Sequence, residues 1–543
     1  MTRKLALPSC LLLALAVTVP AEDAAPRVSG YRNPVIPGFH PDPSIVRVGD
    51  TFYLINSTFE FFPGVPLHRS KDLVNWEPIG NVLTRKSQLP LDGLGPSLGV
   101  FAPTIRHHEG TYYMITTLVG EGGGNFYVTT SDPEGEWSEP IRIRGQGGID
   151  PSLFFDDDGT AYLHSTGGKP GVPGPGGIYQ STIDLATGEL TSEPHLVWPG
   201  TGGRYPEGPH MYKVSGRYYL MISEGGTEYG HMVTIARSDR PEGPFEECPR
   251  NPILTHRDTQ FDQPSQGTGH PDLVQDAEGT WWMVFLAFRP QGGYFHHLGR
   301  ETYLAPVAWD DQGWPVVNDG RPVPLQVEVK GLPEQPVPES PVRVPFDGPL
   351  GVRWNHVRNP VTGAYSTTER PGWLTLHGSA LTMATADQSP TFVGRRQQHL
   401  SARMATRLDF APRRDGEEAG LVLYRHPVHR YELGVRRAGG VREVFVRQTI
   451  GDRLSAITAS APLPGNGSVE LQVVATPLEY ALSYELEGGE PVELDRAMTR
   501  FLSSEVAGGF VGTYVGLYAT GNGEPAATPA AFDWFDYEPR RED

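Results

Sequence analysis

The chain has 543 residues and a net charge of −19, with 65 Gly and 52 Pro. A surface this acidic argues against nucleic acid and anionic membranes as partners, because both bind basic patches. The glycines and prolines are dispersed between aromatic and β-branched runs, which indicates a turn-rich all-β protein of two or three domains rather than a disordered one.

The first 21 residues have the pattern of a secretory signal peptide. Arg3 and Lys4 form a basic start, an apolar run covers 5–19, and small residues follow at the usual cleavage spacing. The apolar run is too short to span a membrane. We therefore expect a secreted protein, periplasmic or extracellular. Only Cys248 would remain in the mature chain, so its stability should come from a large core rather than from disulfides.

Five segments of the chain repeat one pattern, which consists of a Pro, a short apolar strand, a turn with Gly and an aromatic-rich strand. They begin at Asp42, Ala102, Asp150, Glu207 and His270. Each strand pair is too small to bury its own faces, and the turn glycines suit tight hairpins. The repeats predict a five-bladed β-propeller over residues 22–329, with a sandwich of accidental likeness as the alternative.

The second half of the chain has a different composition. Residues 330–342 are Pro-rich and predict an extended linker. Residues 343–543 contain alternating apolar and polar stretches without long helical periodicity, which predicts a β-sandwich. Its stretch GTYVGLYATGN, 512–522, is a candidate to reach the propeller and close the mouth of its channel.

The repeats begin at or beside side chains that can carry chemistry. The innermost strands of a propeller run along its axis, so their corresponding ends converge at one mouth of the channel. Asp42, Asp150 and Glu207 would meet there with His270. Like charges in one pocket repel and raise one another's pKa, so such a cluster points to function rather than to structure.

Two kinds of chemistry use grouped carboxylates. Hydrolysis of a glycosidic bond needs one ionised carboxylate and one carboxyl that holds a proton near neutral pH. A calcium site is the alternative, since Ca²⁺ also takes carboxylate oxygens, and a central imidazole with waters could hold a cation too. The chain has no Cys or HExxH pattern for zinc.

Several longer motifs resemble glycoside hydrolase family 43, in its two-domain branch of β-xylosidases and α-L-arabinofuranosidases. They are NPVIPGFHPDPS, GGIDPSLFFDDDG, PEGPHMYKVSGRYYLM, GTGHPDLV and GRET, in the family's order. The likeness runs from about Asn33 to the C-terminus, because that branch also carries a concanavalin-like sandwich. It implies an inverting, exo-acting enzyme without a required cofactor, which releases terminal β-D-xylose or α-L-arabinofuranose from xylan-type polysaccharides or oligosaccharides.

The resemblance also implies a role for each candidate residue. Asp42 matches the general base, Glu207 the general acid, and Asp150 the acid that raises the proton donor's pKa and orients it. Inversion requires water between base and sugar, so the two catalytic carboxyls should lie roughly 6.5–9.5 Å apart, not ~5–5.5 Å. Arg300 of GRET matches an arginine that holds sugar hydroxyls, and Phe59 matches an aromatic wall of the sugar pocket.

Phe101 departs from the family's pattern. Xylosidase members often have Trp in GVWAP, where this chain has GVFAP. Phe59 and Phe101 are then the predicted pocket walls, and both xylose and arabinofuranose stay candidate sugars. His270 matches the central histidine that in many members faces Ca²⁺ or ordered water, so we predict substrate or metal contact for it. In the sandwich, Asp347 and Asp533 are candidates for structural calcium.

Two other functions fit parts of the same pattern. A propeller could bind sugar without turnover, although three carboxylates favour an enzyme. A retaining fructan-type hydrolase is also a propeller, and a carboxyl separation of about 5 Å would favour it. Carbohydrate is the expected partner, with no nucleic acid and no membrane, and an oligomer is compatible with the sequence.

Overall fold

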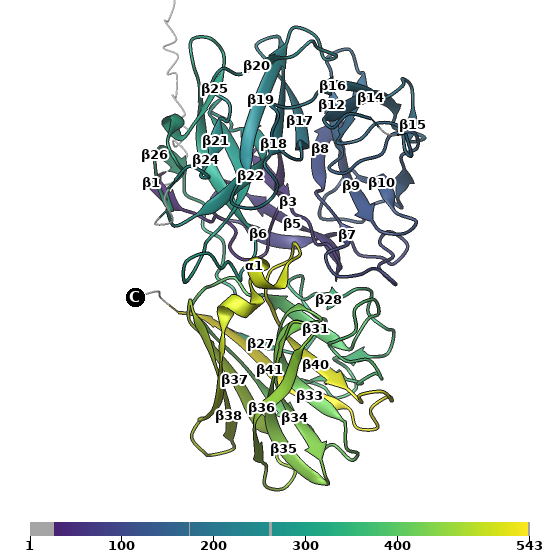
Figure 1. The fold of residues 1–543 in the computed structure, drawn as a ribbon, viewed down its shortest axis with the longest axis vertical. Helices are drawn as coiled ribbons and strands as arrows, with labels where there is room; N and C mark the ends of the chain where they lie inside the picture. Colours follow the sequence, from purple (N-terminus) through teal and green to yellow (C-terminus); the bar gives the residue numbers. More distant parts are fainter. Residues whose placement is uncertain (1–26, 173, 260–262, 541–543) are drawn as a thin grey trace, which may run out of the picture.

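The computed structural model describes residues 27–172, 174–259 and 263–540. It is almost entirely β, in two domains stacked along the long axis of the molecule (Figure 1). Its helical pieces are short, namely η1 (Asn318–Gly320), η2 (Thr499–Leu502) and α1 (Ser504–Ala507). The all-β prediction is confirmed. The predicted signal peptide lies outside the described residues, and no helix within them is long and apolar enough to cross a membrane.

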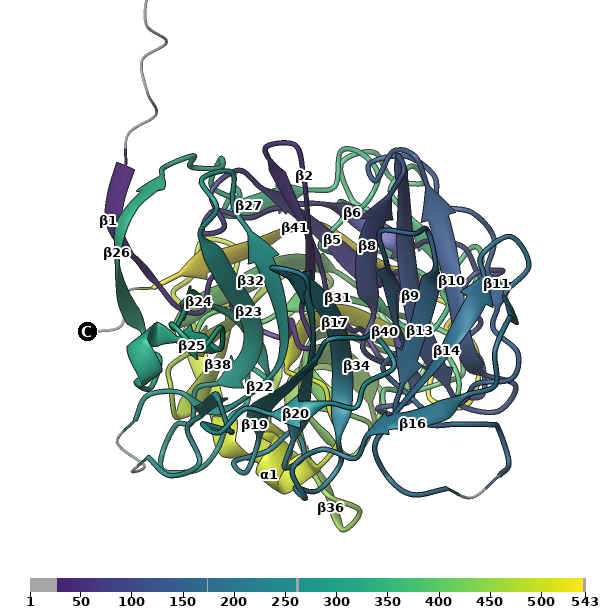
Figure 2. The ribbon, with the colours of Figure 1, turned by 90° about the horizontal axis from the view of Figure 1, so that it is seen from above.

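The first domain contains five antiparallel sheets of four or five strands arranged around an axis (Figure 2). Neighbouring inner strands contact one another, and the last contacts the first, so they form a closed ring. A ring of radiating sheets is the architecture of a propeller. The inner strands are β2 (Ser44–Val48), β8 (Thr104–His108), β12 (Ser152–Phe155), β17 (Glu207–Val214) and β22 (Gln266–Gln275).

The outer strands complete the sheets in chain order. The first sheet adds β3 (Thr51–Ile55), β5 (Gly64–Ser70) and β6 (Glu77–Leu83), and the second adds β7 (Gly99–Val100), β9 (Thr111–Val119), β10 (Gly124–Thr130) and β11 (Ile141–Arg142). The third adds β13 (Ala161–Ser165), β14 (Ile178–Asp184), β15 (Glu189–Leu190) and β16 (His195–Trp198). The fourth adds β18 (Arg217–Glu224), β19 (Met232–Ser238), β20 (Glu246–Glu247) and β21 (Leu254–Thr255), and the fifth adds β23 (Trp281–Phe288), β24 (Glu301–Trp309) and β25 (Pro315–Val317).

The repeated sequence pattern explains these hairpins. The turn between β2 and β3 contains Gly49 at φ +63°, and the turn between β8 and β9 contains Gly110 at φ +80°. Glycine adopts this left-handed conformation without steric cost. The aromatic side chains of the second strands pack between sheets, as Tyr53 does against Tyr112 with ring centroids 5.5 Å apart.

The second domain is a sandwich of two sheets that enclose one core. Strand β37 (Val469–Ala475) alternates buried and half-buried residues along its length, as expected of a strand with one face in a core. One sheet contains β27 (Arg343–Pro345), β29 (Tyr365–Ser366), β30 (Leu374–Leu376), β32 (Ala402–Asp409), β37 (Val469–Ala475), β38 (Glu479–Leu486), β39 (Val492–Met498) and β41 (Ala530–Pro539). The other contains β31 (Phe392–Arg396), β33 (Glu418–His426), β34 (His429–Ala438), β35 (Val441–Ile450), β36 (Leu454–Pro462) and β40 (Tyr514–Thr520).

The two domains share backbone pairing and a common aromatic cluster. Strand β4 (Phe61–Phe62) of the propeller pairs with β28 (His356–Val357) of the second domain. The ring of Phe61 stacks on Tyr514 of β40, with centroids 3.9 Å apart. The predicted linker is shorter than expected, because its first four residues belong to β26 (Gln326–Pro333), which pairs with β1 (Arg27–Arg32).

Candidate active site

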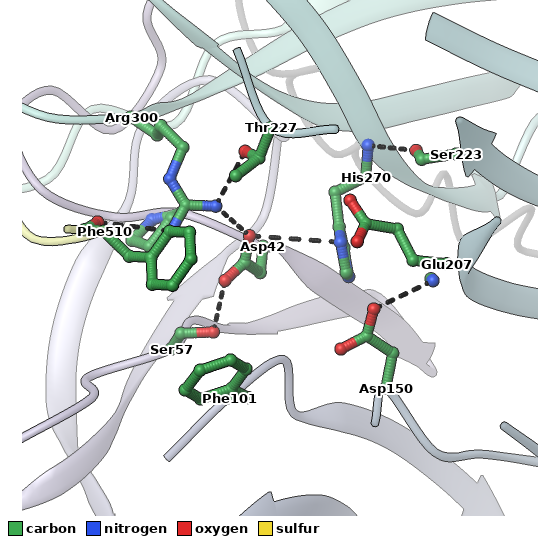
Figure 3. A network of polar contacts seen from close by, with 12 residues as sticks. Asp42, Ser57, Phe101, Asp150, Glu207, Ser223, Thr227, His270, Arg300 and Phe510 are labelled. Carbon is green, nitrogen blue, oxygen red and sulfur yellow. Dashed lines mark hydrogen bonds and ion pairs between the residues drawn. The ribbon is translucent and has the colours of Figure 1, made fainter. Parts of the chain in front are cut away.

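Three of the predicted site residues share an unusual backbone conformation. Asp42, Asp150 and His270 have φ of 52°, 55° and 46°, and each directly precedes a proline. A following proline disfavours the right-handed helical region, and Asp and His are among the few residues other than Gly that enter the left-handed one. Such strain persists at functional sites because the surroundings fix it. In Figure 3 the three side chains converge with Glu207 on one spot.

The Asp42 carboxylate is buried, and both of its oxygens accept hydrogen bonds. It is 5% exposed, the Ser57 hydroxyl donates to its Oδ2 at 2.5 Å, and Arg300 Nη1 donates to its Oδ1 at 2.7 Å. Burial alone would raise the pKa of Asp42, but Arg300, then His270 and Ser57, lower it below its ordinary value. Asp42 is therefore ionised at neutral pH, as a general base must be.

Asp150 and Glu207 form a carboxyl pair beside the axis. Asp150 is also 5% exposed, and its Oδ2 accepts a hydrogen bond of 3.0 Å from the Gly208 N–H. Burial, then the charges of Glu207 and Asp42, raise the pKa of Asp150 well above its ordinary value. Asp150 therefore releases its proton at a higher pH than Asp42 does.

His270 lies between the base and the carboxyl pair. Its backbone N–H donates to the Ser223 hydroxyl at 2.5 Å, and its Nδ1 lies 3.9 Å from Asp42 Oδ1. Burial lowers the pKa of His270, although Asp42 and Glu207 oppose the shift. The ring packs over Gly208, where a Cβ would come within 3.1 Å of it. The imidazole is thus a neutral, fixed hydrogen-bonding group at the axis.

The geometry around His270 does not suit a metal held by several protein ligands. In the described part of the chain, no group of three or more His, Cys, Asp or Glu side chains could hold a metal ion. Asp42, the carboxylate facing His270, already binds Arg300 and Ser57. In the sandwich, Asp533 lies 4.0 Å from an arginine, Arg407. Calcium at His270, or near Asp347 and Asp533, therefore stays a prediction.

Arg300 connects the base to the aromatic side of the site. Besides Asp42, its Nη1 donates to Thr227 Oγ1 at 3.0 Å, and its Nη2 donates to the Phe510 carbonyl at 3.2 Å. Its guanidinium lies 5.6 Å from the centroid of Phe59 and 5.8 Å from that of Phe510. Arg300 was predicted to hold sugar hydroxyls, and the structure adds that it fixes the charge of Asp42.

Three phenylalanines form the aromatic wall. Phe59 contacts Phe101 at a centroid distance of 5.0 Å, and Phe510 stacks on Phe59 at 5.6 Å. Phe59 is only 2% exposed, whereas Phe510 is 39% exposed. Phe101 is half-buried, so the accessible part of the wall is supplied by Phe101 and by Phe510, a residue of the second domain (Figure 3).

The predicted segment 512–522 reaches the propeller at its start, where Thr513 donates to the His297 carbonyl, but a residue just before it enters the site. Most of residues 512–522 form β40 within the sandwich. The Phe510 N–H donates to Ser97 Oγ at 3.0 Å, which anchors the segment. No repeat or motif marks Phe510 in the sequence. Its weak signal was an aromatic residue directly after two glycines, Gly508 and Gly509.

His231 is a second site residue that the sequence did not reveal. It is fully buried directly before β19, and its Nε2 lies 3.4 Å from Glu207 Oε1. A Cβ at position 269 would come within 2.3 Å of its ring, so Gly269 makes room for it. His231 does not lie at the start of a repeat. Only the packing of β19 against β22 brings it to Glu207.

A hollow opens beside Glu207, on the side of exposed Phe510 rather than of buried Phe59. Its lining includes Thr166, Tyr205, Glu207, Glu228 and Phe510. Tyr205 is 65% exposed and has φ of 52°, a conformation that is costly for an aromatic residue. The hollow gives a bulky molecule access to Glu207.

An ionised carboxylate, Asp42, opposite two further carboxyls of which Asp150 has a raised pKa meets the requirement for hydrolysing a glycosidic bond. The fold and the site thus define a glycoside hydrolase. The family model of glycosyl hydrolases family 43 matches residues 31–315, and that of the β-xylosidase C-terminal concanavalin A-like domain matches residues 343–538. The chain belongs to glycoside hydrolase family 43, as its motifs predicted.

Known relatives are similar over nearly their whole length. A protein of Bacteroides ovatus named non-reducing end α-L-arabinofuranosidase is 42% identical, over 97% of this chain and 98% of its own. A xylosidase/arabinosidase of Butyrivibrio fibrisolvens is 40% identical, over 93% of this chain and 99% of its own. Among solved structures, a xylan β-1,4-xylosidase from Bacillus halodurans C-125 has a TM-score of 0.87 at 36% identity, covering 94% of this chain and 100% of that chain.

Proposed function

We propose that this protein is an inverting, exo-acting glycosidase that releases terminal α-L-arabinofuranose or β-D-xylose from xylan-type polysaccharides or oligosaccharides. The observation that supports it best is that the pKa of Asp42 is lowered while that of Asp150, beside Glu207, is raised. Membership of family 43 adds to it, and the relatives' names include both sugars.

The proposed reaction uses one water and one protein-held proton. Asp42 takes a proton from water as the oxygen attacks the anomeric carbon, and Glu207 protonates the departing glycosidic oxygen. Asp150 keeps the proton available because it shares it with Glu207. Afterwards Asp42 carries a proton and the pair lacks one, so exchange with solvent restores both.

Substrate orientation follows from what surrounds the two carboxyls. The side of Asp42 is enclosed by Arg300 and Phe59, both at most 5% exposed, which suits a single terminal sugar. The side of Glu207 opens into the hollow with Tyr205 and Phe510. The remainder of the chain would leave through that hollow, and an enclosed inner end explains exo action.

Two chromogenic substrates and one NMR experiment test the proposal. Release of p-nitrophenol from the α-L-arabinofuranoside or the β-D-xyloside is expected, and their ratio gives the sugar preference. Proton NMR during hydrolysis should show the sugar first in the inverted anomeric form. A retained anomer would identify a double-displacement hydrolase, and binding without release from either substrate would identify a sugar-binding propeller.

We also propose that the protein is exported. The support is the basic start and apolar run of residues 1–21. Expression of the full chain in a bacterium should place the activity in the periplasm or medium, with a mature N-terminus close to residue 22. Activity confined to the cytoplasm, with residues 1–21 retained, would contradict the proposal.

A further inference from the structure

A small cavity at the junction of the two domains is lined by nitrogen-rich side chains. The propeller contributes His40 and His68, and the sandwich contributes Arg353, Arg395 and Arg396. His40 and His68 are in edge contact, with ring centroids 5.3 Å apart. Apart from Gln398, the remaining lining consists of prolines, Gly80 and Val352. Within the part of the chain that the structure describes, no carboxylate lines this cavity.

Two buried nitrogen atoms around the cavity have no hydrogen-bond partner among the described residues. Arg396 donates from Nε to the Phe39 carbonyl at 2.7 Å and from Nη1 to Asn355 at 2.9 Å, but its buried Nη2 has no partner. The buried Nδ1 of His68 has none either. Arg396 is 7% exposed and His68 is 4% exposed, so water outside the cavity does not satisfy these atoms.

The other two arginines also lack an acidic partner within the described residues. Arg395 is 5% exposed, and its guanidinium lies 5.1 Å from the Tyr537 ring rather than against a carboxylate. Half-buried Arg353 forms no ion pair with a described residue. Glu339 and Glu538 line an adjoining hollow together with both arginines, but they are exposed and pair with neither.

The electrostatic environment agrees with these contacts. Burial, then Arg396 and His68, lower the pKa of His40 well below its ordinary value, and burial with Arg353 and Arg396 lowers that of His68 to about 3. Burial, then Arg353, lowers the pKa of Arg395 to about 10. Each group is thus shifted mainly by burial and further by its neighbouring arginines. Buried charge of one sign is unfavourable unless an opposite charge compensates it.

We propose that this cavity binds a small monovalent anion, of which chloride is the commonest. The unpartnered Arg396 Nη2 and His68 Nδ1, with the guanidiniums of Arg353 and Arg395, supply donors and positive charge. The space suits an ion about the size of one water molecule, so a halide fits better than an oxyanion. The net charge of −19 makes this buried cationic cluster all the more exceptional.

The position of the cavity gives the anion a structural role. Its walls come from both domains, so a bound anion stabilises their contact. Arg396 also holds the carbonyl of Phe39, three residues before Asp42 in the chain. The anion would therefore help to fix the stretch that leads to the predicted general base.

Anomalous diffraction from crystals of the protein soaked in sodium bromide tests the site directly. We expect a bromide peak in the cavity within hydrogen-bonding distance of Arg396 Nη2. Bromide peaks elsewhere on the protein with none in this cavity would overturn the proposal.

Thermal unfolding in chloride-free buffer tests the same site in solution. At equal ionic strength, bromide at about ten times its Kd should raise the unfolding midpoint by about 2 °C over gluconate. Arg353→Met should abolish this difference, because it removes a charge that bonds to no other described residue. Arg370→Met is the control, since Arg370 pairs with Asp409 on the sandwich surface and the bromide effect should persist.

Each outcome of the unfolding experiment has a definite meaning. Equal midpoints in bromide and gluconate for the unaltered protein would overturn the proposal, as would an unchanged bromide effect in Arg353→Met. A rise with sulfate but none with bromide would overturn the assignment of a halide.

Discussion

Asp42 and Asp150 start from the same local sequence and end with opposite chemistry. Both stand in Asp-Pro-Ser, both precede an inner strand, both have φ near 50°, and both are 5% exposed. Yet the pKa of Asp42 is lowered and that of Asp150 is raised. The difference comes from what each carboxyl faces.

The contrast shows how a repeat protein separates an acid from a base. Burial acts on both carboxyls in the same direction, so it cannot distinguish them. Arg300, directly before β24 of the fifth sheet, donates to Asp42 and lowers its pKa, whereas its effect on Asp150 is outweighed by burial and by Glu207 from the fourth sheet. The repeat supplies equivalent positions, and the neighbours that differ between repeats shift the two pKa values in opposite directions.

Asp42→Asn should have the largest effect on activity. The amide keeps the size of the carboxyl but cannot accept a proton from water, so kcat should fall by about 10³–10⁴-fold. The loss should be equal for aryl glycosides and for oligosaccharides, because every substrate needs the base. Steady-state kinetics on both substrate types measure it. A loss restricted to oligosaccharides would assign Asp42 to another role.

Glu207→Ala should have the second-largest effect on activity, and the size of that effect should depend on the leaving group. Turnover of oligosaccharides should fall by about 10²–10³-fold, because their leaving oxygen needs a proton. An aryl glycoside with an acidic phenol should lose much less, and isothermal titration should show that oligosaccharide binding survives. Near-normal turnover of oligosaccharides by this variant would contradict the assignment of Glu207 as the general acid.

Arg300→Met should lower kcat/KM by about 10²-fold, through loss of charge-assisted hydrogen bonds. It should also move the acidic limb of the pH profile. Asp42 must be ionised, and its pKa is lowered chiefly by Arg300 once burial is overcome, so activity in the unaltered enzyme is lost only below the usual Asp range. Without Arg300 that pKa rises, and the limb should move up by about one pH unit or more.

Thr227→Val is the matched control for the arginine. It removes the hydroxyl that accepts from Arg300 Nη1 but keeps the guanidinium charge beside Asp42. The acidic limb should stay in place in this variant, whatever happens to the rate. An acidic limb that moves equally in both variants would show that the charge of Arg300 is not the cause.

Asp150→Asn should act mainly on the alkaline limb of the pH profile. It removes the carboxyl whose pKa is raised by burial, Glu207 and Asp42, so the site loses a group that keeps its proton to a pH above the ordinary Asp range. The alkaline limb of kcat/KM should therefore move to lower pH by about one unit. An alkaline limb that keeps its position would mean that the two carboxyls titrate independently.

Phe510→Ala should have the smallest effect, a loss of about tenfold in kcat/KM from the missing aromatic surface. Val506→Ala, on the same segment but outside the site, should keep both activity and unfolding midpoint. Equal losses in the two variants would point to displacement of the whole segment rather than to contact with sugar.

The repeats made much of the site predictable. Asp42, Asp150, Glu207 and His270 could be found because equivalent positions of a propeller converge, and the structure brings them together. His231 could not, because it precedes the third strand of its sheet and reaches Glu207 only through packing. The left-handed backbone at three of these positions was equally hidden, although each precedes a proline.

The contribution of the second domain was harder to foresee. Phe510 follows Phe59 by hundreds of residues, and no periodic pattern connects them. The predicted segment 512–522 was displaced by only a few residues from the one that enters the site. The pattern of residues 512–522 correctly predicted a strand, β40. A strand of the sandwich core stays in its sheet, so a residue outside it enters the site.

The pairing of β4 with β28 has a consequence for how such proteins evolve. Phe61 and Phe62 pair with β28, a strand that lies almost 300 residues later in the chain. Phe61 also packs on Tyr514. Recombination at the Pro-rich stretch would separate these partners and expose an apolar strand edge, which invites aggregation. We therefore expect that exchange of whole domains between relatives is restricted, and that substitutions at this interface occur in both halves of the gene together.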